Sequence, residues 1–331
     1  MQAIMMRETG GPEVLKLESV TDPEITSPTQ IKVQIMAAGV NPVDAKLRSR
    51  GVLLPDGLPA ILGCDGAGVV TETGSEASTF REGDEVWFCH GGLGGLQGNY
   101  AEFAVLEESV CCRKPASLDF EHAAAAPLVL ITAWEALFGR ARLTEGQTLL
   151  VHAGAGGVGH VAIQLAKQVG ARVMTTVSTP DKAEFVRGLG ADLVIDYRKT
   201  DFVDEVLRYT DGVGADVVLD TVGPEIIRQS IPATAHYGDI VTLLDPGPDM
   251  DWKEARNRNL RFSFTLMLTP MLRELPQARA DQVAILRNCS EFIDSGSIKI
   301  ALSESLPLSQ AVDAHRAIEQ GHTQGKIVLT P

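Results

Sequence analysis

The chain of 331 residues lacks the features that place a protein in a membrane or outside the cell. It contains no run of about 18 apolar residues, the length that a membrane-spanning helix needs. No basic stretch followed by an apolar block stands near the start, so no signal peptide is expected. Only five cysteines are present, and they lack the spacing of a metal site or a disulfide framework. These absences predict a reduced, cytoplasmic protein.

Basic residues are also scarce. The 29 Lys and Arg residues stand against 43 Asp and Glu residues, which gives a formal net charge of −14. This excess disfavours nucleic acid and anionic membranes as partners, because both repel an acidic protein. An anionic cofactor would therefore need a local basic pocket. The content of 44% hydrophobic and 22% charged residues is typical of a globular protein, and the length favours two domains.

The middle of the chain carries a glycine motif between an apolar strand and a helix. The run Leu149–Val151 is typical of a buried parallel strand, and Gly154, Gly156 and Gly159 then give the pattern G-x-G-x-x-G. Apolar residues follow at helical spacing, at Val158, Ala162, Leu165 and Val169. Glycines let the backbone approach a pyrophosphate, and the free N–H groups of a helix start attract it. The motif predicts dinucleotide binding; a glycine turn without a phosphate is the alternative.

Strands alternate with helical stretches after this motif, which predicts a doubly wound parallel sheet. Further strands are expected at Arg172–Val177, Ala191–Ile195, Asp216–Gly223 and Gly238–Leu244. An enzyme that prefers the unphosphorylated cofactor usually carries Asp or Glu near the end of the second strand. Here Ser178 and Lys182 follow that strand, and both can donate to a 2′-phosphate. Asp220, at the end of the fourth strand, is interpreted as structural.

The first 125 residues consist of short strands and frequent turns, which indicates an all-β, barrel-like body. Strands are expected at Gln30–Ala37, Gly66–Val70, Asp84–Phe88 and Ala101–Val105. The last segment predicts a helix at Asp281–Ser295, a strand at Ile298–Leu302, a helix at Gln310–Gln320 and a strand at Gly325–Leu329. Ser309 is the expected cap of the second helix, and Gly321 its expected end.

Three motifs stand in one order along the chain: Gly39–Asp44, Gly63–Gly68 and Ala153–Gly159. Together they resemble the medium-chain dehydrogenase/reductase superfamily, in its zinc-free quinone oxidoreductase (zeta-crystallin-like) branch. The resemblance implies an α/β fold with a GroES-like β-barrel-type catalytic domain and a Rossmann domain. The catalytic domain would be discontinuous, over residues 1–125 and 266–331, and the Rossmann domain would span residues 126–265. A homodimer is also implied.

The same resemblance implies NADPH as the cofactor. Ser178, Lys182 and Tyr197 match the positions that hold the 2′-phosphate in this family. Thr132 and the backbone at Leu243 and Leu244 match positions near the nicotinamide. The full set of implied cofactor-binding residues is Asn41, Thr132, Gly154, Gly156, Gly157, Val158, Gly159, Ser178, Lys182, Tyr197, Leu243 and Leu244.

Zinc-dependent members of the superfamily place a Cys where this chain has Asn41, and a His-Glu pair where it has Cys64 and Asp65. An amide is a poor zinc ligand, so we expect no metal. Asn41 is instead the candidate that orients the nicotinamide. Many family members have a Tyr where Lys46 stands; Lys46 either contacts the acceptor or is a surface lysine. Lys326 either reaches the cofactor or lies in solvent.

The expected reaction is hydride transfer from NADPH to a quinone or a related electron-poor carbonyl acceptor, a small molecule. Three alternatives remain: an NADPH-dependent enone or enoyl double-bond reductase, a zinc alcohol dehydrogenase, and a non-enzymatic NADPH-binding or structural protein. The glycine-rich stretch Gly91–Gly98 is either a flap over the substrate or a plain surface connection.

Overall fold

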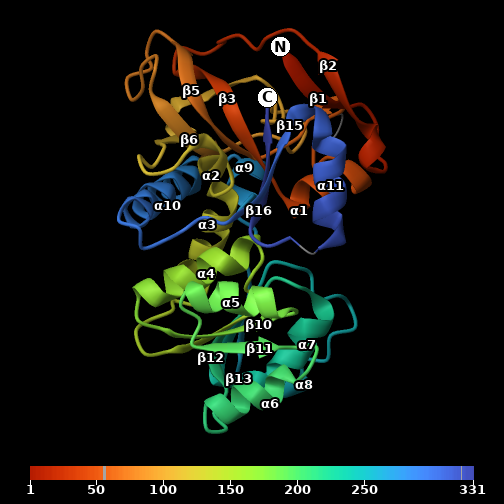
Figure 1. The fold of residues 1–331 in the computed structure, drawn as a ribbon, viewed down its shortest axis with the longest axis vertical. Helices are drawn as coiled ribbons and strands as arrows, with labels where there is room; N and C mark the ends of the chain where they lie inside the picture. Colours follow the sequence, from red (N-terminus) through yellow and green to blue (C-terminus); the bar gives the residue numbers. More distant parts are fainter. Residues whose placement is uncertain (55–56, 322) are drawn as a thin grey trace. The chain divides into compact units, whose positions relative to one another are not determined.

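The computed structural model describes residues 1–54, 57–321 and 323–331, which form two compact units. Unit 1 comprises Met1–Leu128 and Leu268–Pro331, and unit 2 comprises Val129–Met267. Unit 1 therefore joins the red and orange start of the chain to its blue end (Figure 1). The boundaries lie at 128 and 267, where the sequence placed them at 125 and 265. No described helix is both long and apolar enough to cross a membrane.

Unit 1 is built on two mainly antiparallel sheets, as the short strands of the sequence predicted. Its strands are β1 (Gln2–Met6), β2 (Leu15–Ser19), β3 (Gln30–Val40), β4 (Ala60–Ile61), β5 (Asp65–Thr73), β6 (Glu85–Cys89), β7 (Phe103–Glu107), β8 (Cys111–Arg113), β15 (Leu302–Pro307) and β16 (Lys326–Thr330). One sheet has the order β2-β1-β4. The other has the order β15-β16-β3-β5-β6-β8, with β7 also paired to β3. Strand β16 joins the chain's end to β3 through the register Val328↔Gly39.

The helices of unit 1 connect and cover these sheets. They are α1 (Pro42–Arg50), α2 (Phe120–Ala124), α9 (Thr269–Leu272), α10 (Pro276–Asp294) and α11 (Ala311–Gln320), with short turns at η1 (Pro12–Val14), η2 (Glu108–Val110) and η4 (Leu308–Gln310). Asn41 caps α1 after β3 ends, because proline at the next position suits a helix start and cannot extend a sheet. The local pair Asn41-Pro42 thus sets the change from strand to helix.

Two predictions for the last segment are wrong. The strand expected at Ile298–Leu302 begins only at Leu302, where pairing with β16 starts. Ile298 and Ile300 are buried in an irregular stretch, so their alternation reflects burial rather than a strand. Ser309 does not cap α11, because a 3-10 turn over Leu308–Gln310 leads directly into the helix. Gly321 ends that helix in the left-handed conformation, as predicted.

Unit 2 is a parallel six-stranded sheet with helices. Its strands are β9 (Thr148–Val151), β10 (Arg172–Val177), β11 (Leu193–Asp196), β12 (Ala215–Asp220), β13 (Thr234–Thr242) and β14 (Arg261–Phe264), in the order β11-β10-β9-β12-β13-β14. The sequence missed β14, a short edge strand that is mostly exposed. The order reverses direction beside β9, and ligands of open α/β sheets bind at the carboxyl ends of the strands at such a point.

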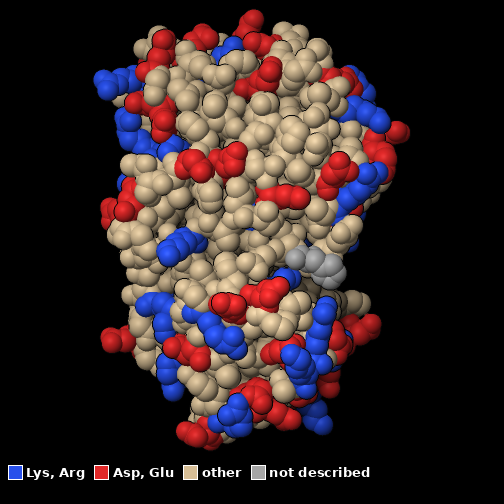
Figure 2. Space-filling model, viewed as in Figure 1, with Lys and Arg blue, Asp and Glu red and all other residues tan. Residues whose placement is uncertain are grey.

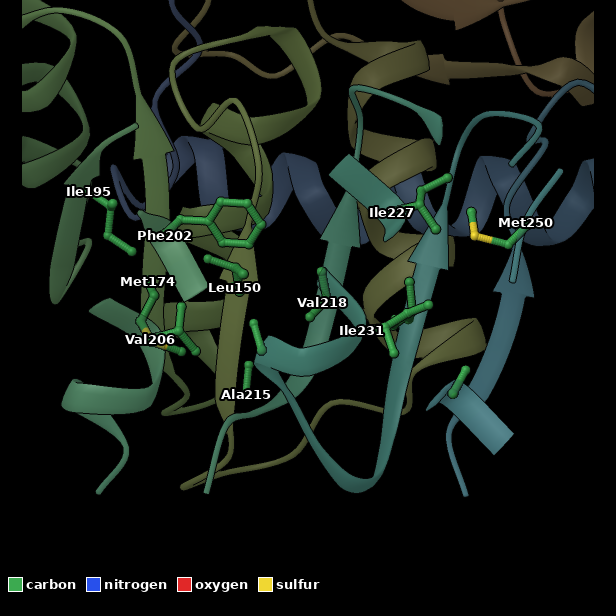
Figure 3. Packing of buried hydrophobic residues seen from close by; sticks show 13 residues of the cluster. Leu150, Met174, Ile195, Phe202, Val206, Ala215, Val218, Ile227, Ile231 and Met250 are labelled. Carbon is green, nitrogen blue, oxygen red and sulfur yellow. The ribbon is translucent and has the colours of Figure 1, made fainter. Parts of the chain in front are cut away.

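Helices α3 (Pro127–Trp134), η3 (Glu135–Arg140), α4 (Gly157–Gln168), α5 (Pro180–Gly188), α6 (Phe202–Tyr209), α7 (Pro224–Ala233) and α8 (Lys253–Asn257) complete this region. One core cluster joins Leu150, Met174 and Val218 of the sheet to Val206 and Ile231 of the helices (Figure 3). These strand residues are fully buried, because a parallel sheet is covered on both faces. The covered sheet holds the strand ends, and hence the glycine turn after β9, in fixed positions.

Candidate active site

The glycine turn of unit 2 lies between β9 and α4. A Cβ atom at Gly154 would lie 2.0 Å from Thr175 Oγ1, and one at Gly159 would lie 2.4 Å from the Ala153 carbonyl oxygen. Glycine is thus required at both positions by packing inside the turn. A Cβ at Gly156 would meet nothing closer than 3.2 Å. The middle glycine is therefore packed less tightly than the other two, at the position where a pyrophosphate approaches the backbone in dinucleotide-binding turns.

The start of α4 is left without protein anions. Its N-cap, Gly156, has no side chain to accept a hydrogen bond, and no acidic residue stands in its first turn. The next helices differ: α5 begins at the Thr179 cap, α6 at the Asp201 cap, and α7 carries Glu225 in its first turn. Because the N-terminus of a helix carries partial positive charge, an uncapped start favours a bound anion.

A buried histidine that the sequence did not single out supports this turn. His152 Nε2 lies 2.9 Å from Ser230 Oγ, whose hydroxyl donates to the Ile226 carbonyl, so the ring donates here. His152 Nδ1 accepts from Thr176 Oγ1 at 3.2 Å, and Thr176 in turn accepts from the Ala153 N–H. Burial lowers the pKa of His152 to about 3, so the ring is neutral. Nothing in the local sequence signals these contacts, which join residues far apart in the chain.

The three residues proposed for a 2′-phosphate lie around the ends of two neighbouring strands. Val177 of β10 pairs with Asp196 of β11, so Ser178 and Tyr197 follow at the same edge of the sheet. Lys182 stands in the first turn of α5, where its N–H bonds the Thr179 cap. None of the ion pairs among the described residues includes Lys182. Tyr197 is 53% exposed. The local arrangement thus offers Lys182, two hydroxyl groups and the exposed Arg198, which follows Tyr197, at one edge.

The remaining candidates of unit 2 lie on α3 and after β13. Thr132 is buried within α3. The Leu243 N–H donates to the Asp220 carbonyl, and the Leu244 N–H donates to Thr242 Oγ1. Asp220 accepts from the backbone of Val222 and from Thr242 Oγ1, so it shapes two strand ends. Its contacts are those of a structural residue.

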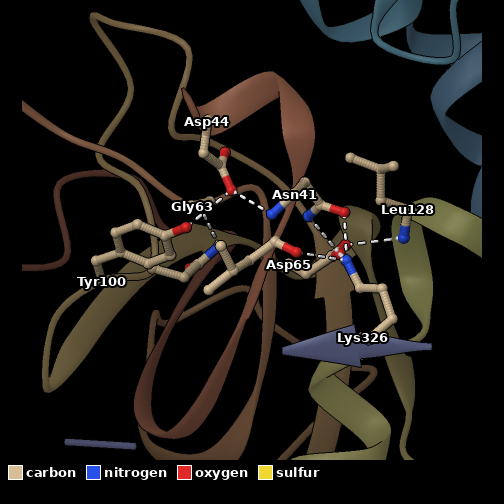
Figure 4. A network of polar contacts seen from close by, with 9 residues as sticks. Asn41, Asp44, Gly63, Asp65, Tyr100, Leu128 and Lys326 are labelled. Carbon is tan, nitrogen blue, oxygen red and sulfur yellow. Dashed lines mark hydrogen bonds and ion pairs between the residues drawn. The ribbon is translucent and has the colours of Figure 1, made fainter. Parts of the chain in front are cut away.

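A buried polar network holds the candidate residues of unit 1 (Figure 4). The Asn41 amide donates to Asp65 Oδ2 at 2.9 Å, and Asn41 Oδ1 accepts from the Lys326 ammonium at 2.5 Å. Lys326 also donates to the Val40 carbonyl at 2.8 Å and lies 4.0 Å from Asp65 Oδ2. Asp65 Oδ1 accepts from the Leu128 N–H, at the start of α3. The alternative that Lys326 lies in solvent is wrong: only 3% of it is exposed.

The network continues from Asn41 to a second buried carboxyl group. Asp44 Oδ2 accepts from the Asn41 N–H and from the Tyr100 hydroxyl, both at 2.8 Å. Asp44 Oδ1 is buried without a partner among the described residues. Burial raises the pKa of Asp44 to about 7 and raises that of Asp65, whereas it lowers the pKa of Lys326. The sequence missed Tyr100 and gave Asp44 no role.

Two further predictions concern Lys46 and the glycine-rich stretch Gly91–Gly98. Lys46 is exposed on α1, and its pKa is lowered by desolvation and then by Arg50. In the glycine-rich stretch, a Cβ at Gly91 would lie 1.9 Å from the Gln97 carbonyl oxygen, and one at Gly98 would lie 2.3 Å from the Leu62 carbonyl oxygen. Close backbone packing thus explains these glycines. A gating role for the loop stays a prediction.

The residues around Asn41 do not fit a zinc ion. A catalytic zinc needs about three thiolate, imidazole or carboxylate ligands. Asn41 offers an amide, Asp65 already faces the Lys326 ammonium, and burial raises the pKa of the Cys64 thiol far above its ordinary value. Within the described residues, no group of three or more His, Cys, Asp and Glu side chains could hold a metal ion.

Charged side chains of both signs are interspersed on the face shown in Figure 2. The basic residues of that face form no continuous surface. On this face, a positive site for an anionic ligand is therefore a local feature.

Comparison with known proteins identifies the relatives of this chain. Residues 27–116 match the family described as alcohol dehydrogenase GroES-like domain, and residues 189–329 match the one described as zinc-binding dehydrogenase. The NADPH-dependent alkenal/one oxidoreductase of Arabidopsis thaliana is 34% identical over 100% of this chain and 80% of its own length. A quinone oxidoreductase of Pseudomonas aeruginosa is 35% identical over 97% of both chains.

A solved structure agrees with these matches. The Escherichia coli quinone oxidoreductase complexed with NADPH has a TM-score of 0.88 at 29% identity, and the similarity covers 100% of both chains. Both units and the glycine turn are thus accounted for by one set of relatives. This chain belongs to the medium-chain dehydrogenase/reductase superfamily, in its quinone oxidoreductase branch.

Proposed function

We propose that this chain is an NADPH-dependent oxidoreductase that transfers hydride to a quinone or a related electron-poor carbonyl acceptor without zinc. The observation that carries the proposal is the uncapped start of α4, with Gly156 at the N-cap and no acidic residue in the first turn. The relatives support it, because their names specify NADPH, quinones and alkenals or alkenones. We also propose a homodimer in the cytoplasm, on the family resemblance alone.

The residues of unit 2 fit the cofactor. The turn residues Gly154–Gly159 would hold the pyrophosphate, and Ser178, Lys182 and Tyr197 the 2′-phosphate. Thr132, Leu243 and Leu244 would contact the nicotinamide. The reduced nicotinamide supplies the hydride when the cofactor is bound.

The residues of unit 1 would serve the acceptor side of the reaction. We propose that Asn41 orients the nicotinamide and that Asp65 and Lys326 hold the side-chain amide of Asn41 in place. Both polar atoms of the Asn41 side chain are already engaged in the protein, so its orientation is set before any ligand binds. Lys46, exposed on α1, is the proposed acceptor contact. Hydrogen-bond donors must stabilise the oxyanion that forms, because no metal fits here.

Cofactor selectivity tests the proposal. Lys182→Ala removes a cation beside Ser178 and Tyr197, so we expect KM for NADPH to rise about tenfold while KM for NADH changes little. Lys199→Ala is the matched control, because Lys199 lies near the same edge but is paired with Asp196 at 2.9 Å. An unchanged KM for NADPH in Lys182→Ala would defeat the assignment of the 2′-phosphate site.

Reduction of an enone double bond is the second candidate. The Arabidopsis relative favours it, since its name specifies alkenals and alkenones and it is 34% identical over the whole chain. A panel of quinones, enones, aldehydes and alcohols with NADPH separates the two activities. Parallel assays with a chelator test zinc. Loss of turnover in chelator, restored by zinc, would contradict the zinc-free proposal.

A further inference from the structure

Helix α10 carries an arginine, Arg279, that has no acidic partner among the described residues. Arg279 donates from Nη2 to the Cys89 carbonyl at 2.8 Å and to His90 Nδ1 at 3.2 Å, and from Nη1 to Gln282 Oε1 at 3.0 Å. All three acceptors are neutral. None of the ion pairs in the described part of the chain includes Arg279. The guanidinium is half-buried and remains charged, since its pKa lies far above neutral even when burial lowers it.

Other arginines of this acidic chain have the acidic partner that Arg279 lacks among the described residues. Arg48, only 2% exposed, is paired with Glu319. Arg261 is paired with Asp239, and Arg258 with Glu254 at 2.7 Å. A cation held away from solvent loses hydration that only an anion fully replaces. Arg279 is paired with neutral groups alone, so its charge is available to an anionic partner from outside the chain.

The groups next to Arg279 also donate. His90 Nδ1 accepts from Arg279, so the ring proton is on Nε2. Burial lowers the pKa of His90 to about 4, so the ring is a neutral donor near neutral pH. Among the described residues, the Gly91 N–H donates to the thioether sulfur of Met271 at 3.2 Å, and a thioether is a weak acceptor. The Arg279 guanidinium thus contacts the His90 ring, and the Gly91 N–H, a third donor, follows His90 directly in the chain.

Cys89 connects this set to the network around Asn41. Cys89 of β6 pairs with Asp65 of β5 in the sheet register, and its carbonyl accepts from Arg279. We propose that Arg279, His90 and the Gly91 N–H form an acceptor-recognition site for a carboxylate. The inference rests on the proposed function and narrows its substrate class. The preferred acceptors would carry a carboxylate on an electron-poor enone or quinone.

A matched pair of acceptors tests this site. 3-Benzoylacrylate and its methyl ester share one enone and differ in charge. We expect the wild-type protein to favour the acid, and Arg279→Gln to lower kcat/KM for the acid by about 10- to 100-fold, mainly through KM. The ester should change less than about threefold. Arg279→Lys should fall between, because an ammonium keeps the charge without the planar fork. Arg287→Gln, an exposed arginine on the same helix, is the control.

Binding without turnover gives a second readout. Calorimetry should detect the saturated product 4-oxo-4-phenylbutanoate binding to the wild-type protein and not to Arg279→Gln. His90→Ala should weaken that binding less, since it removes one neutral donor. Equal losses for acid and ester, or equal binding to wild type and variant, would overturn the proposed site. If no acceptor oxidises NADPH at all, the proposed function fails instead.

Discussion

The glycine turn of unit 2 and the polar network of unit 1 depend on opposite kinds of residue. The turn depends on glycines, at positions 154, 156, 157 and 159 of six consecutive residues. The network depends on side chains that lie far apart in the sequence: Asn41 and Asp65 are 24 residues apart, and Asn41 and Lys326 are 285 apart. Neighbouring residues alone define the turn, whereas the network forms only once the chain has folded.

This difference predicts different responses to mutation. In the turn, an added methyl group acts directly on packing or on the ligand. In the network, removing one charge leaves its buried partner uncompensated, so the variant loses folding stability in addition to any effect on catalysis. Variants of the two sites should therefore separate ligand affinity from folding.

The largest effect is expected in the turn. Gly154→Ala places a Cβ 2.0 Å from Thr175 Oγ1, and Gly156→Ala places one 3.2 Å from the Ala153 carbonyl oxygen. The first variant should lose stability by about 1 to 3 kcal/mol through overpacking. Gly156→Ala should lose less stability than Gly154→Ala but weaken NADPH binding by about 100-fold, because the methyl group occupies the path of the pyrophosphate. Chemical denaturation and calorimetry with NADPH measure the two quantities.

The pair of variants is its own control. Equal loss of stability in both would show that Gly156 is also a packing glycine. Full NADPH affinity in Gly156→Ala would remove the cofactor from the turn.

The network variant comes next. Lys326→Met leaves the Asp65 carboxylate buried without its cation, and we expect the free energy of unfolding to fall by about 3 to 5 kcal/mol. The double variant Lys326→Met with Asp65→Asn should recover part of that loss, because no charge is then stranded. Lys16→Met, at an exposed position of β2, should change stability little. A double variant no more stable than the single one would show that the pair is not coupled.

The sequence predicted what depends on local pattern. The strand–turn–helix order around Gly154–Gly159 and the break at Asn41 are set by neighbouring residues, and the structure contains both. The pairing of β10 with β11 that joins Ser178 to Tyr197 follows from a parallel sheet in this order. These features need no knowledge of distant contacts.

The rest depends on contacts that no local pattern encodes. Lys326 begins a strand in an ordinary Gly-Lys pair, and only the pairing of β16 with β3 brings it to Asn41. His152 and Ser230 meet across 78 residues. The error at Ile298–Leu302 has the same origin, because alternation shows which residues are buried but not which strand pairs with which.

The third prediction concerns the pH dependence of folding stability, through Asp44 of the polar network. The pKa of Asp44 is about 7 in the folded chain against 3.8 ordinarily. Between these values the folded chain holds a proton that the unfolded chain has released, so stability is greatest at low pH and falls as pH rises toward 7. The loss is at most roughly 4 kcal/mol. Asp44→Asn keeps an acceptor for Tyr100 and should flatten the change in unfolding free energy between pH 5 and pH 8. An unchanged slope would show that Asp44 stays ionised.

The smallest effect is expected at Lys46, which belongs to neither the glycine turn nor the polar network. Because it is exposed on α1, its loss should leave folding and NADPH affinity intact. If it contacts the acceptor, Lys46→Ala lowers kcat/KM for quinones and enones by about threefold, since an exposed charge in water contributes little. Lys46→Arg should retain most of the activity, because the charge is kept. Full kcat/KM in Lys46→Ala across both acceptor classes would make it a surface lysine, and the acceptor contacts would then lie with the donors around Arg279.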